Sequence, residues 1–449
     1  MEKESSNNIP ENVMNDKPKK NVGKTVAIIA GALVLVGGLA AGGIYLATHQ
    51  TPTTIIDSDT SGSIALKDGE NKIKAGGTYT FTGSTANGKI EIDTTEAVKI
   101  ILNNVSITNP SGAAIKSKGT TGRVTIELVG DNKLVSTDTN AEDPAAAVSG
   151  DSELEITGSG SVTIESNGKG IKADNGLGLS GSGTYTITAK DDTLHSNGNI
   201  TITSGTYVLN TGDDAIHADG TLKIASGKVV IEKSHEGLEA NIVEISGGDV
   251  SVTASDDGIN AQNSDGTSRV GVVGDGKLAI SGGKVYVNSG GDGLDSNGAI
   301  AISGGETYVD GPLNDGNGAI DCDGEISITG GTLIAVGSSG MAQNATNATQ
   351  PSVLINLNQS YGGNIIFGSI SYEPSKKFQS VLISSDKLKV GETYQLSIGG
   401  SQVQSVTISQ NITGQGNGMM GGGMPGGGMG GQGQQAQQGQ QPQMTQRTR

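Results

Sequence analysis

The amino-acid sequence predicts an all-β protein built as a parallel β-helix, a solenoid with coils of about 22 residues. Three observations lead to this fold class. The 449 residues include 73 Gly, no Trp and only 3 Phe, which is unusual for a helical bundle or for an enzyme with an aromatic core. Short runs of alternating polar and apolar residues, bounded by Gly, Asn or Asp, are typical of strands with one buried face. A motif also recurs at a nearly fixed interval through the middle of the chain.

The recurring motif places one or two acidic residues shortly before an aliphatic residue. Its copies start at Asp191, Asp213, His235, Asp256, Gly291 and, more loosely, Asn317. A unit of this length cannot bury its apolar face alone, so it must stack on its copies. Each coil then rises by the inter-strand spacing of about 4.8 Å, and equivalent residues lie above one another. The predicted core column is Leu194, Ile216, Leu238, Ile259, Leu294 and Ile320.

The N-terminal part of the chain predicts membrane export. Residues 1–24 form a polar leader, and residues 25–48 are expected to form a transmembrane signal anchor, because Val26–Ala47 carries no charge and follows four lysines. The small residues Ala40 and Ala41 leave cleavage by a signal peptidase open. We therefore expect a single-pass protein of the cell membrane with an extracellular C-terminal part, or a secreted protein if the segment is cleaved.

The remaining chain divides by its sequence texture. We expect a linker at 49–64, the β-helix at 65–350 with less regular first coils, and a C-terminal β cap at 351–414 that protects the open end of the stack. Residues 415–449 are rich in Gly, Met and Gln and are expected to be disordered. A monomer is the expected state.

Charge and cysteine content exclude several function classes. The net charge of −17 argues against nucleic acid as a partner, because such binding requires Lys and Arg to displace counterions from phosphates. Cys322 is the single cysteine, so no intrachain disulfide can form. It aligns with small residues of the other copies, which favours a packing role.

Stacking of the copies also gathers acidic residues into columns. One column holds Asp192, Asp214, Glu236, Asp257 and Asp292, its neighbour holds Asp191, Asp213 and Asp256, and a third holds His195, His217, Glu239, Asn260, Asp295 and Asp321. Crowded carboxylates repel one another unless a cation compensates, and too few basic residues are expected nearby. Ca²⁺ takes six to eight oxygens at about 2.4 Å, roughly half the spacing between coils. We predict Ca²⁺ as the cofactor, with ligands among Asp191, Asp192, Asp213, Asp214, Glu236, Asp256, Asp257, Asp292, Asp295 and Asp321.

Two other interpretations of these columns stay open. Asp and Asn are favoured in tight turns, where they cap backbone donors. This accounts for residues such as Asn197 and Asp219, but a turn does not require the acidic doublets. His195 and His217 could ligate a softer metal, although hydrogen bonding along the stack is the simpler expectation.

Two tyrosines are candidates for carbohydrate binding. Counted from the preceding corner glycine, Tyr286 and Tyr308 point outward and lie one coil apart, where their rings could hold a sugar face. Tyr185 and Tyr207 are expected to point inward by the same count.

Four features together resemble a bacterial calcium-dependent carbohydrate-binding β-helix family. They are the stretch Gly77–Gly83 (GTYTFTG), the segment Ile101–Thr108 (ILNNVSIT), the Asp-Asp-x-aliphatic-His repeats, and the late Gly391–Tyr394 (GETY). The resemblance covers about residues 65–412. It implies a right-handed β-helix on the scaffold of pectate-type polysaccharide lyases, bound calcium, and adhesion to cell-wall polysaccharide such as acidic pectin-like or cellulosic chains.

The expected function is therefore non-catalytic, calcium-dependent polysaccharide binding, with no catalytic residue assigned. A calcium-dependent polysaccharide lyase is the alternative, but the resembled enzymes use a basic residue beside the metal. Within the repeats the single arginine, Arg269, lies in an insertion, while Lys190, Lys223 and Lys233 remain available. Asp213 with Asp214, or Asp256 with Asp257, could imitate the acid pair of a hydrolase, yet the recurrence of such doublets in successive coils favours a metal role. A surface adhesin or scaffold without glycan affinity is the second alternative.

Overall fold

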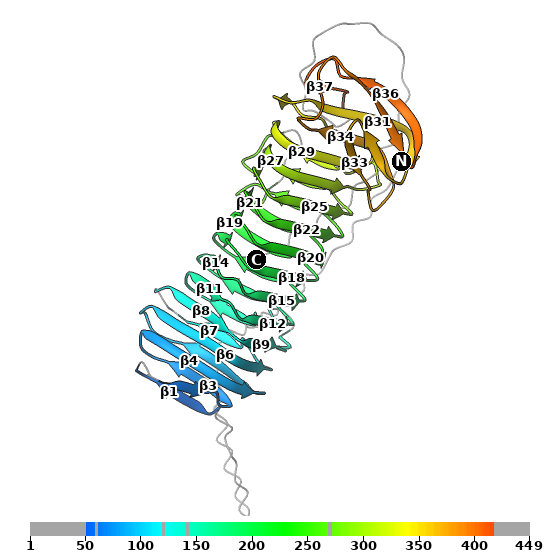
Figure 1. The fold of residues 1–449 in the computed structure, drawn as a ribbon. Helices are drawn as coiled ribbons and strands as arrows, with labels where there is room; N and C mark the ends of the chain where they lie inside the picture. The colour runs from blue at the N-terminus through cyan, green and yellow to red at the C-terminus, as the bar shows by residue number, and fades with distance from the viewer. Residues whose placement is uncertain (1–50, 59–61, 119–121, 141–142, 268–271, 417–449) are drawn as a thin grey trace, which may run out of the picture. The chain divides into compact units, whose positions relative to one another are not determined.

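The computed structural model describes residues 51–416 except 59–61, 119–121, 141–142 and 268–271, all within one compact unit, Thr51–Arg449. The expected leader, the signal anchor, Arg269 and all but the first two residues of the Gly/Met/Gln-rich tail lie outside the described residues. Within these residues the chain forms an all-β parallel solenoid of about 12 turns without an α-helix, which confirms the predicted fold class (Figure 1). No helix among them is long and apolar enough to cross a membrane.

Each complete coil contributes strands to three faces, here called A, B and C. Face A carries the acidic columns. Its strands pair in parallel along the stack. They are β1 (Thr53–Ile56), β3 (Gly69–Ile73), β5 (Gly88–Ile92), β7 (Ile115–Ser117), β10 (Val148–Gly150), β13 (Ile171–Ala173), β16 (Leu194–Ser196), the first parts of β19 (Ile216–Ile224) and β21 (Leu238–Ile245), β23 (Ile259–Ala261), β26 (Leu294–Ser296) and β28 (Ile320–Cys322).

Face B follows face A along each coil. It contains β2 (Ser63–Ala65), β4 (Gly77–Thr85), β6 (Val98–Asn109), β8 (Val124–Val129), β11 (Leu154–Gly158), β14 (Leu177–Leu179), β17 (Ile200–Ile202), the second parts of β19 and β21, β24 (Lys277–Ile280), β27 (Ala299–Asp310), β29 (Ile326–Gly337) and β30 (Asn347–Ala348). Face C contains the ends of β4, β6, β27 and β29 together with β9 (Asp131–Ser136), β12 (Ser161–Ser166), β15 (Thr184–Ala189), β18 (Thr206–Asn210), β20 (Lys228–Ser234), β22 (Asp249–Ala254) and β25 (Lys284–Ser289).

The first strand begins earlier than the sequence pattern suggests. Thr53–Ile56, within the expected linker at 49–64, is β1 and pairs in parallel with β3. Its four β-branched residues suit a strand, because branched side chains pack well on a pleated surface. Periodicity missed it because the segment lies far from the regular copies.

The expected core column is present in the register of face A. Leu194, Ile216, Leu238, Ile259, Leu294 and Ile320 pair in sequence, and each is at most 2% exposed. Burying such a side chain contributes about 1.5–3 kcal/mol, so a stack of them replaces a large aromatic core. Tyr185 and Tyr207 also point inward as predicted, with ring centroids 4.6 Å apart.

Glycine is required at the corner between faces B and C. Gly283 has a φ of +81°, and a Cβ there would lie 2.7 Å from backbone atoms of the coil below. Because L side chains rarely adopt this conformation, position 283 requires glycine, and the following strand of face C begins directly after it.

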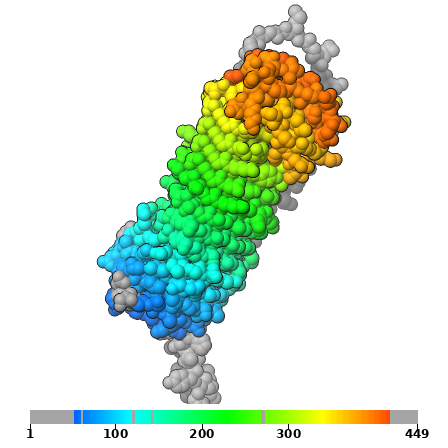
Figure 2. All heavy atoms as spheres, in the orientation of Figure 1, coloured from blue at the N-terminus to red at the C-terminus, as the bar shows by residue number. Residues whose placement is uncertain are grey.

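A C-terminal segment covers the last coils. β34 (Phe378–Ser384) pairs antiparallel with β29 and with β31 (Ser352–Tyr361), which also pairs with β37 (Ile412–Thr413). A second antiparallel sheet has the order β33 (Ile370–Tyr372), β32 (Ile365–Phe367), β35 (Thr393–Ile398) and β36 (Ser401–Thr407). This segment has its own apolar core, and Figure 2 shows it (orange) in direct contact with the last coils (yellow). We call it the cap.

Candidate functional site

The acidic columns lie on face A and in the turns that precede it. The register places His195, His217, Glu239, Asn260, Asp295 and Asp321 in one column, as the spacing predicts. Backbone hydrogen bonds between the turns align Asp192 with Asp214, and Asp257 with Asp292. Each face A strand of this region has three positions, aliphatic, polar and small, so the polar side chain points outward between two inward-facing neighbours.

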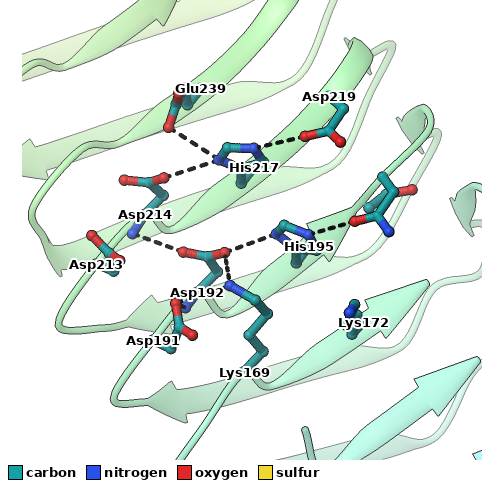
Figure 3. A network of polar contacts seen from close by, with 12 residues as sticks. Lys169, Lys172, Asp191, Asp192, His195, Asp213, Asp214, His217, Asp219 and Glu239 are labelled. Atoms are coloured by element: carbon teal, nitrogen blue, oxygen red, sulfur yellow. Dashed lines mark hydrogen bonds and ion pairs between the residues drawn. The ribbon is translucent and has the colours of Figure 1, made fainter. Parts of the chain in front are cut away.

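In the first half of these columns the protein supplies its own cations (Figure 3). We call this half the N-terminal acidic network; it consists of Asp191, Asp192, His195, Asp213, Asp214, His217, Asp219 and Glu239, together with Lys169. Lys169 Nζ lies 2.9 Å from Asp191 Oδ1 and 2.6 Å from Asp192 Oδ2. His195 Nδ1 lies 2.9 Å from the same Asp192 oxygen. Burial opposes ionisation of Asp192, but its hydrogen bond to His195 and the charge of Lys169 outweigh it and lower its pKa to about 2. This carboxylate is ionised and paired.

His217 is the second cation of the N-terminal acidic network. Its Nδ1 lies 3.0 Å from both Asp214 Oδ2 and Glu239 Oε2, and its Nε2 lies 3.1 Å from Asp219 Oδ1. Burial opposes the charged ring, but hydrogen bonds to Asp214 and Glu239 raise the pKa of His217 to about 11. The His217 ring stacks on His195 with centroids 4.9 Å apart. Hydrogen bonding along the stack, the simpler expectation for both histidines, is confirmed for His217, which reaches Glu239 of the next coil, whereas His195 hydrogen-bonds Asp192 and Asn197 of its own coil.

The expectation that basic residues are too few to compensate is therefore wrong for this half. The main cation, Lys169, belongs to the coil that precedes the first repeat copy, where the pattern gives no reason to look for it. Its ammonium group contacts both Asp191 and Asp192.

The second half of the columns, which we call the C-terminal acidic cluster, consists of Glu236, Asp256, Asp257, Asp292, Asp295 and Asp321. Asp257 Oδ1 accepts a hydrogen bond from the backbone NH of Asp292 at 2.6 Å, and Asp292 Oδ1 accepts one from Gly318 at 2.5 Å. Asp192 Oδ1 does the same for the NH of Asp214 at 3.2 Å. Turn capping thus accounts for one oxygen of Asp257 and one of Asp292, and the second oxygen of each has no side-chain cation beside it among the described residues, whereas the second oxygen of Asp192 contacts Lys169 and His195.

Burial and mutual repulsion oppose ionisation of the carboxyl groups in the C-terminal acidic cluster. Burial, reinforced by neighbouring carboxylates, raises the pKa of Asp257 to about 6 and the pKa of Asp292 to about 8, and raises the pKa of Asp295 well above its usual range. Among the described residues, no lysine or arginine forms an ion pair with this cluster. Among the ion pairs of the part of the chain that the structure describes, the cluster takes part in one, from His235 Nε2 to Asp256 Oδ2, at 3.8 Å.

Asn260 carries a further sign of an incomplete site. Its Nδ2 donates to Glu236 Oε2 at 3.0 Å, whereas its Oδ1 is buried without a hydrogen-bond partner. Burying an oxygen in this way costs free energy, so an acceptor of this kind is suited to a cation. Oxygen donors without nitrogen or sulfur are the chemistry that calcium prefers.

Four groups of three side chains have potential ligand atoms within 4.8 Å of one another in the part of the chain described. Three belong to the N-terminal acidic network, where Lys169 or His217 already contacts the carboxylates. The fourth belongs to the second half. The groups are Asp191–Asp192–Asp213, Asp192–His195–His217, Asp214–His217–Glu239 and His235–Glu236–Asp256.

The candidate carbohydrate-binding tyrosines lie on face C, beneath the cap. Tyr286 and Tyr308 pair one coil apart and point outward as predicted. The ring stacked on Tyr308 is Tyr372 of the cap, with centroids 5.0 Å apart. The hydroxyls of Tyr286 and Tyr372 both donate to Asp310, at 3.1 and 2.7 Å. The tyrosines are therefore half-buried parts of a junction rather than an open pair.

A groove of about 690 Å³ opens at this junction, between face C and the sheet that contains β33. Its lining residues are Lys228, Val230, Asp249, Ser251, Lys284, Tyr286, Tyr308, Asn364, Ser371, Tyr372 and Glu373. The sequence pattern gives the positions of Lys228, Asp249 and Lys284, since each follows a corner glycine. The cap residues could not be found this way, because the cap has no repeat to align.

Comparison with known proteins identifies the family. A family model described as "Carbohydrate-binding domain-containing protein" matches residues 67–316. The chain belongs to this carbohydrate-binding domain family. No curated protein matches it. A solved structure described as the polysaccharide lyase-like protein from C. thermocellum, gadolinium derivative, is 22% identical and aligns over 61% of this chain and 95% of that chain. Its TM-score is 0.35, too low to support a structural argument.

The part matched by the carbohydrate-binding domain family holds most of the candidate residues. Residues 67–316 include the N-terminal acidic network and the coil wall of the groove, but end before Asp321 and before the cap. The cap wall of the groove, with Tyr372, is therefore not part of the matched segment.

Cys322 is buried, and burial raises the pKa of its thiol to about 11, in keeping with the packing role expected for it.

Proposed function

We propose that the protein is an extracellular calcium-binding protein that adheres to polysaccharide without catalysis. Membership of the carbohydrate-binding domain family supports the glycan part of this proposal. The observation that carries the calcium part is the C-terminal acidic cluster, whose carboxylates have raised pKa values and no lysine or arginine partner among the described residues. The apolar, charge-free segment Val26–Ala47 after four lysines supports the extracellular location.

The calcium ligands we propose are narrower than the ten residues that the sequence pattern suggests. Asp257, Asp292 and Asp295, with Asn260 Oδ1, are the ligands we propose, because their free oxygens are not engaged by protein cations among the described residues. Their carboxylates are not among the four close groups, so the ion would have to draw them together. Asp191 and Asp192 are set aside because Lys169 contacts both, and Asp214 because His217 contacts it. Asp213 is set aside with them, because the neighbouring carboxylates Asp191 and Asp192 already contact Lys169. Bound Ca²⁺ would supply positive charge and coordination positions for sugar hydroxyl or carboxylate oxygens, including those of acidic pectin-like chains.

The lyase alternative requires a basic side chain beside the metal. The described ion pairs put Lys223 against Glu244 of face B, at 3.7 Å, and Lys169 inside the N-terminal acidic network. No described lysine or arginine pairs with the C-terminal acidic cluster. We therefore assign no catalytic residue.

The test combines metal titration with polysaccharide retention. Full-length protein is titrated with Ca²⁺ in a calorimeter, and its retention on homogalacturonan and on cellulose is measured with Ca²⁺ and with a chelator. We expect calcium binding and calcium-dependent retention on homogalacturonan. The double variant Asp292→Asn/Asp295→Asn should lose both, whereas Glu165→Gln, an exposed carboxylate on face C, should behave as wild type. Retention unaffected by chelation would contradict the calcium proposal, and release of unsaturated uronates would establish the lyase alternative.

A further inference from the structure

We propose that the groove between face C and the cap is a second glycan-binding site, that it accepts an uncharged, hydroxyl-rich polysaccharide, and that it works without calcium. The inference rests on the proposed function in one respect, that the ligand is a glycan. It concerns different residues from the C-terminal acidic cluster, which lies on face A.

Three tyrosines form a rigid part of the groove lining, Tyr286, Tyr308 and Tyr372. Tyr308 is stacked on Tyr372, and Lys284 Nζ lies 5.9 Å from the centroid of the Tyr308 ring. Asp310, which is fully buried, accepts hydrogen bonds from the hydroxyls of Tyr286 and Tyr372 and from the backbone NH of Ser375. These contacts hold the rings in place before any ligand arrives. Binding therefore costs little side-chain entropy, and aromatic rings present the apolar surface that sugar CH groups contact.

The charged residues of the groove balance one another. Lys228, Asp249 and Lys284 follow one another in a single column, one coil apart, and Glu373 of the cap faces the same space. Two cations and two carboxylates leave no net charge, so a polyanion gains no electrostatic advantage. Alternating donors and acceptors instead suit hydroxyl groups, which both donate and accept hydrogen bonds.

The size and course of the groove fit a chain rather than a single sugar. A volume of about 690 Å³ falls within the range usual for ligand sites. Its outward positions Val230, Ser251, Tyr286 and Tyr308 come from four successive coils. Three inter-strand spacings separate the first coil from the fourth, about 14 Å, which gives room for a short oligosaccharide.

The test uses full-length protein in a chelator, so that the calcium site cannot contribute. Cellohexaose, mannohexaose and hexagalacturonate are titrated separately and binding is followed by calorimetry. Ser251→Trp places a large side chain in the groove from an outward position, and Tyr308→Ala removes part of the aromatic lining. Thr163→Trp is the matched control, since Thr163 lies in the same column four coils away. Tyr308→Phe keeps the ring and should retain binding.

We expect at least one neutral hexasaccharide to bind wild type with equal affinity with and without calcium. Ser251→Trp and Tyr308→Ala should each weaken it at least tenfold, and Thr163→Trp should not. Absence of binding by both neutral sugars, wild-type affinity in Ser251→Trp, or tighter binding of hexagalacturonate in chelator would each overturn this inference. Calcium-dependent retention on homogalacturonan would still stand in those cases, so failure of the groove is distinguishable from failure of the proposed function.

Discussion

The two halves of the acidic columns both crowd carboxylates together, but they differ in whether side-chain cations of the protein contact those carboxylates. In the N-terminal acidic network, Lys169 and His217 contact the carboxylates directly. In the C-terminal acidic cluster, Asp257 and Asp292 keep the same turn-capping hydrogen bonds but have no lysine or arginine partner among the described residues. The aspartates are thus equivalent in backbone role and differ in what neutralises them. Position in a repeat predicts structure, whereas the neighbours decide whether an aspartate is available to a metal.

The largest effect is expected from removing the built-in cation. Lys169→Met should lower the free energy of unfolding by up to about 3–5 kcal/mol, because it leaves the buried carboxylate of Asp192 with His195 as its remaining side-chain partner. The side chains of Lys169 and Asp192 are 23% and 4% exposed. Calcium should restore part of the lost free energy of unfolding by binding where the ammonium group of Lys169 lay. The N-terminal acidic network would then resemble the C-terminal acidic cluster. Urea unfolding with Ca²⁺ and with chelator measures both effects.

Lys172→Met is the matched control on the same coil. Lys172 Nζ lies 3.7 Å from Asp174 Oδ1, and both side chains are about two-fifths exposed. Exposed pairs contribute about 0–1 kcal/mol, so this variant should unfold nearly as wild type. Equal stability of the two variants would show that Lys169 is not the neutralising cation.

The next effect concerns stabilisation of the second half by metal. At a calcium concentration 100 times the dissociation constant, ligand linkage adds about 2.7 kcal/mol to the free energy of unfolding. Asp292→Asn/Asp295→Asn should abolish this gain, whereas Asp191→Asn, in the first half, should preserve it. Thermal unfolding midpoints with and without Ca²⁺ provide the measurement. If the double variant kept the full calcium-dependent rise in its unfolding midpoint, calcium would have to bind at other residues.

A smaller effect is expected from pH in the absence of metal. The pKa of Asp292 is raised to about 8 in the folded protein from an ordinary value of 3.8, and that of Asp257 to about 6. A raised folded-state pKa gives a stability contribution that is complete below about pH 4 and is lost as pH rises toward 8. Wild type and Asp292→Asn/Asp295→Asn should therefore differ little at pH 4.5, while at pH 8 the variant should be more stable. Parallel pH profiles would contradict the pKa shifts assigned to burial and to the neighbouring carboxylates.

The sequence predicts the solenoid well because a single register governs it. The spacing of Leu194, Ile216 and Leu238 fixes both the coil length and the residues that face inward. The same spacing aligns the acidic residues into columns. The spacing cannot show which of these aspartates contact a cation of the protein, because Lys169 comes from a coil outside the repeat copies. The groove is likewise hidden, since Tyr372 belongs to a cap that shares no period with the coils.

The smallest effect tests whether one added charge strengthens the second half as a metal site. Asn260→Asp would place a carboxylate between Glu239 and Asp295 in the same column. Without metal, like charges on neighbouring strands should destabilise the protein by about 0.2–1 kcal/mol at pH 8. With calcium, an additional anionic ligand should tighten binding several-fold, since ligand charge tunes calcium affinity. Calorimetric titration gives the affinity, with Asn87→Asp, in a turn of an early coil, as the control. Weaker calcium binding in Asn260→Asp would mean that Asn260 positions Glu236 through its amide rather than facing the ion.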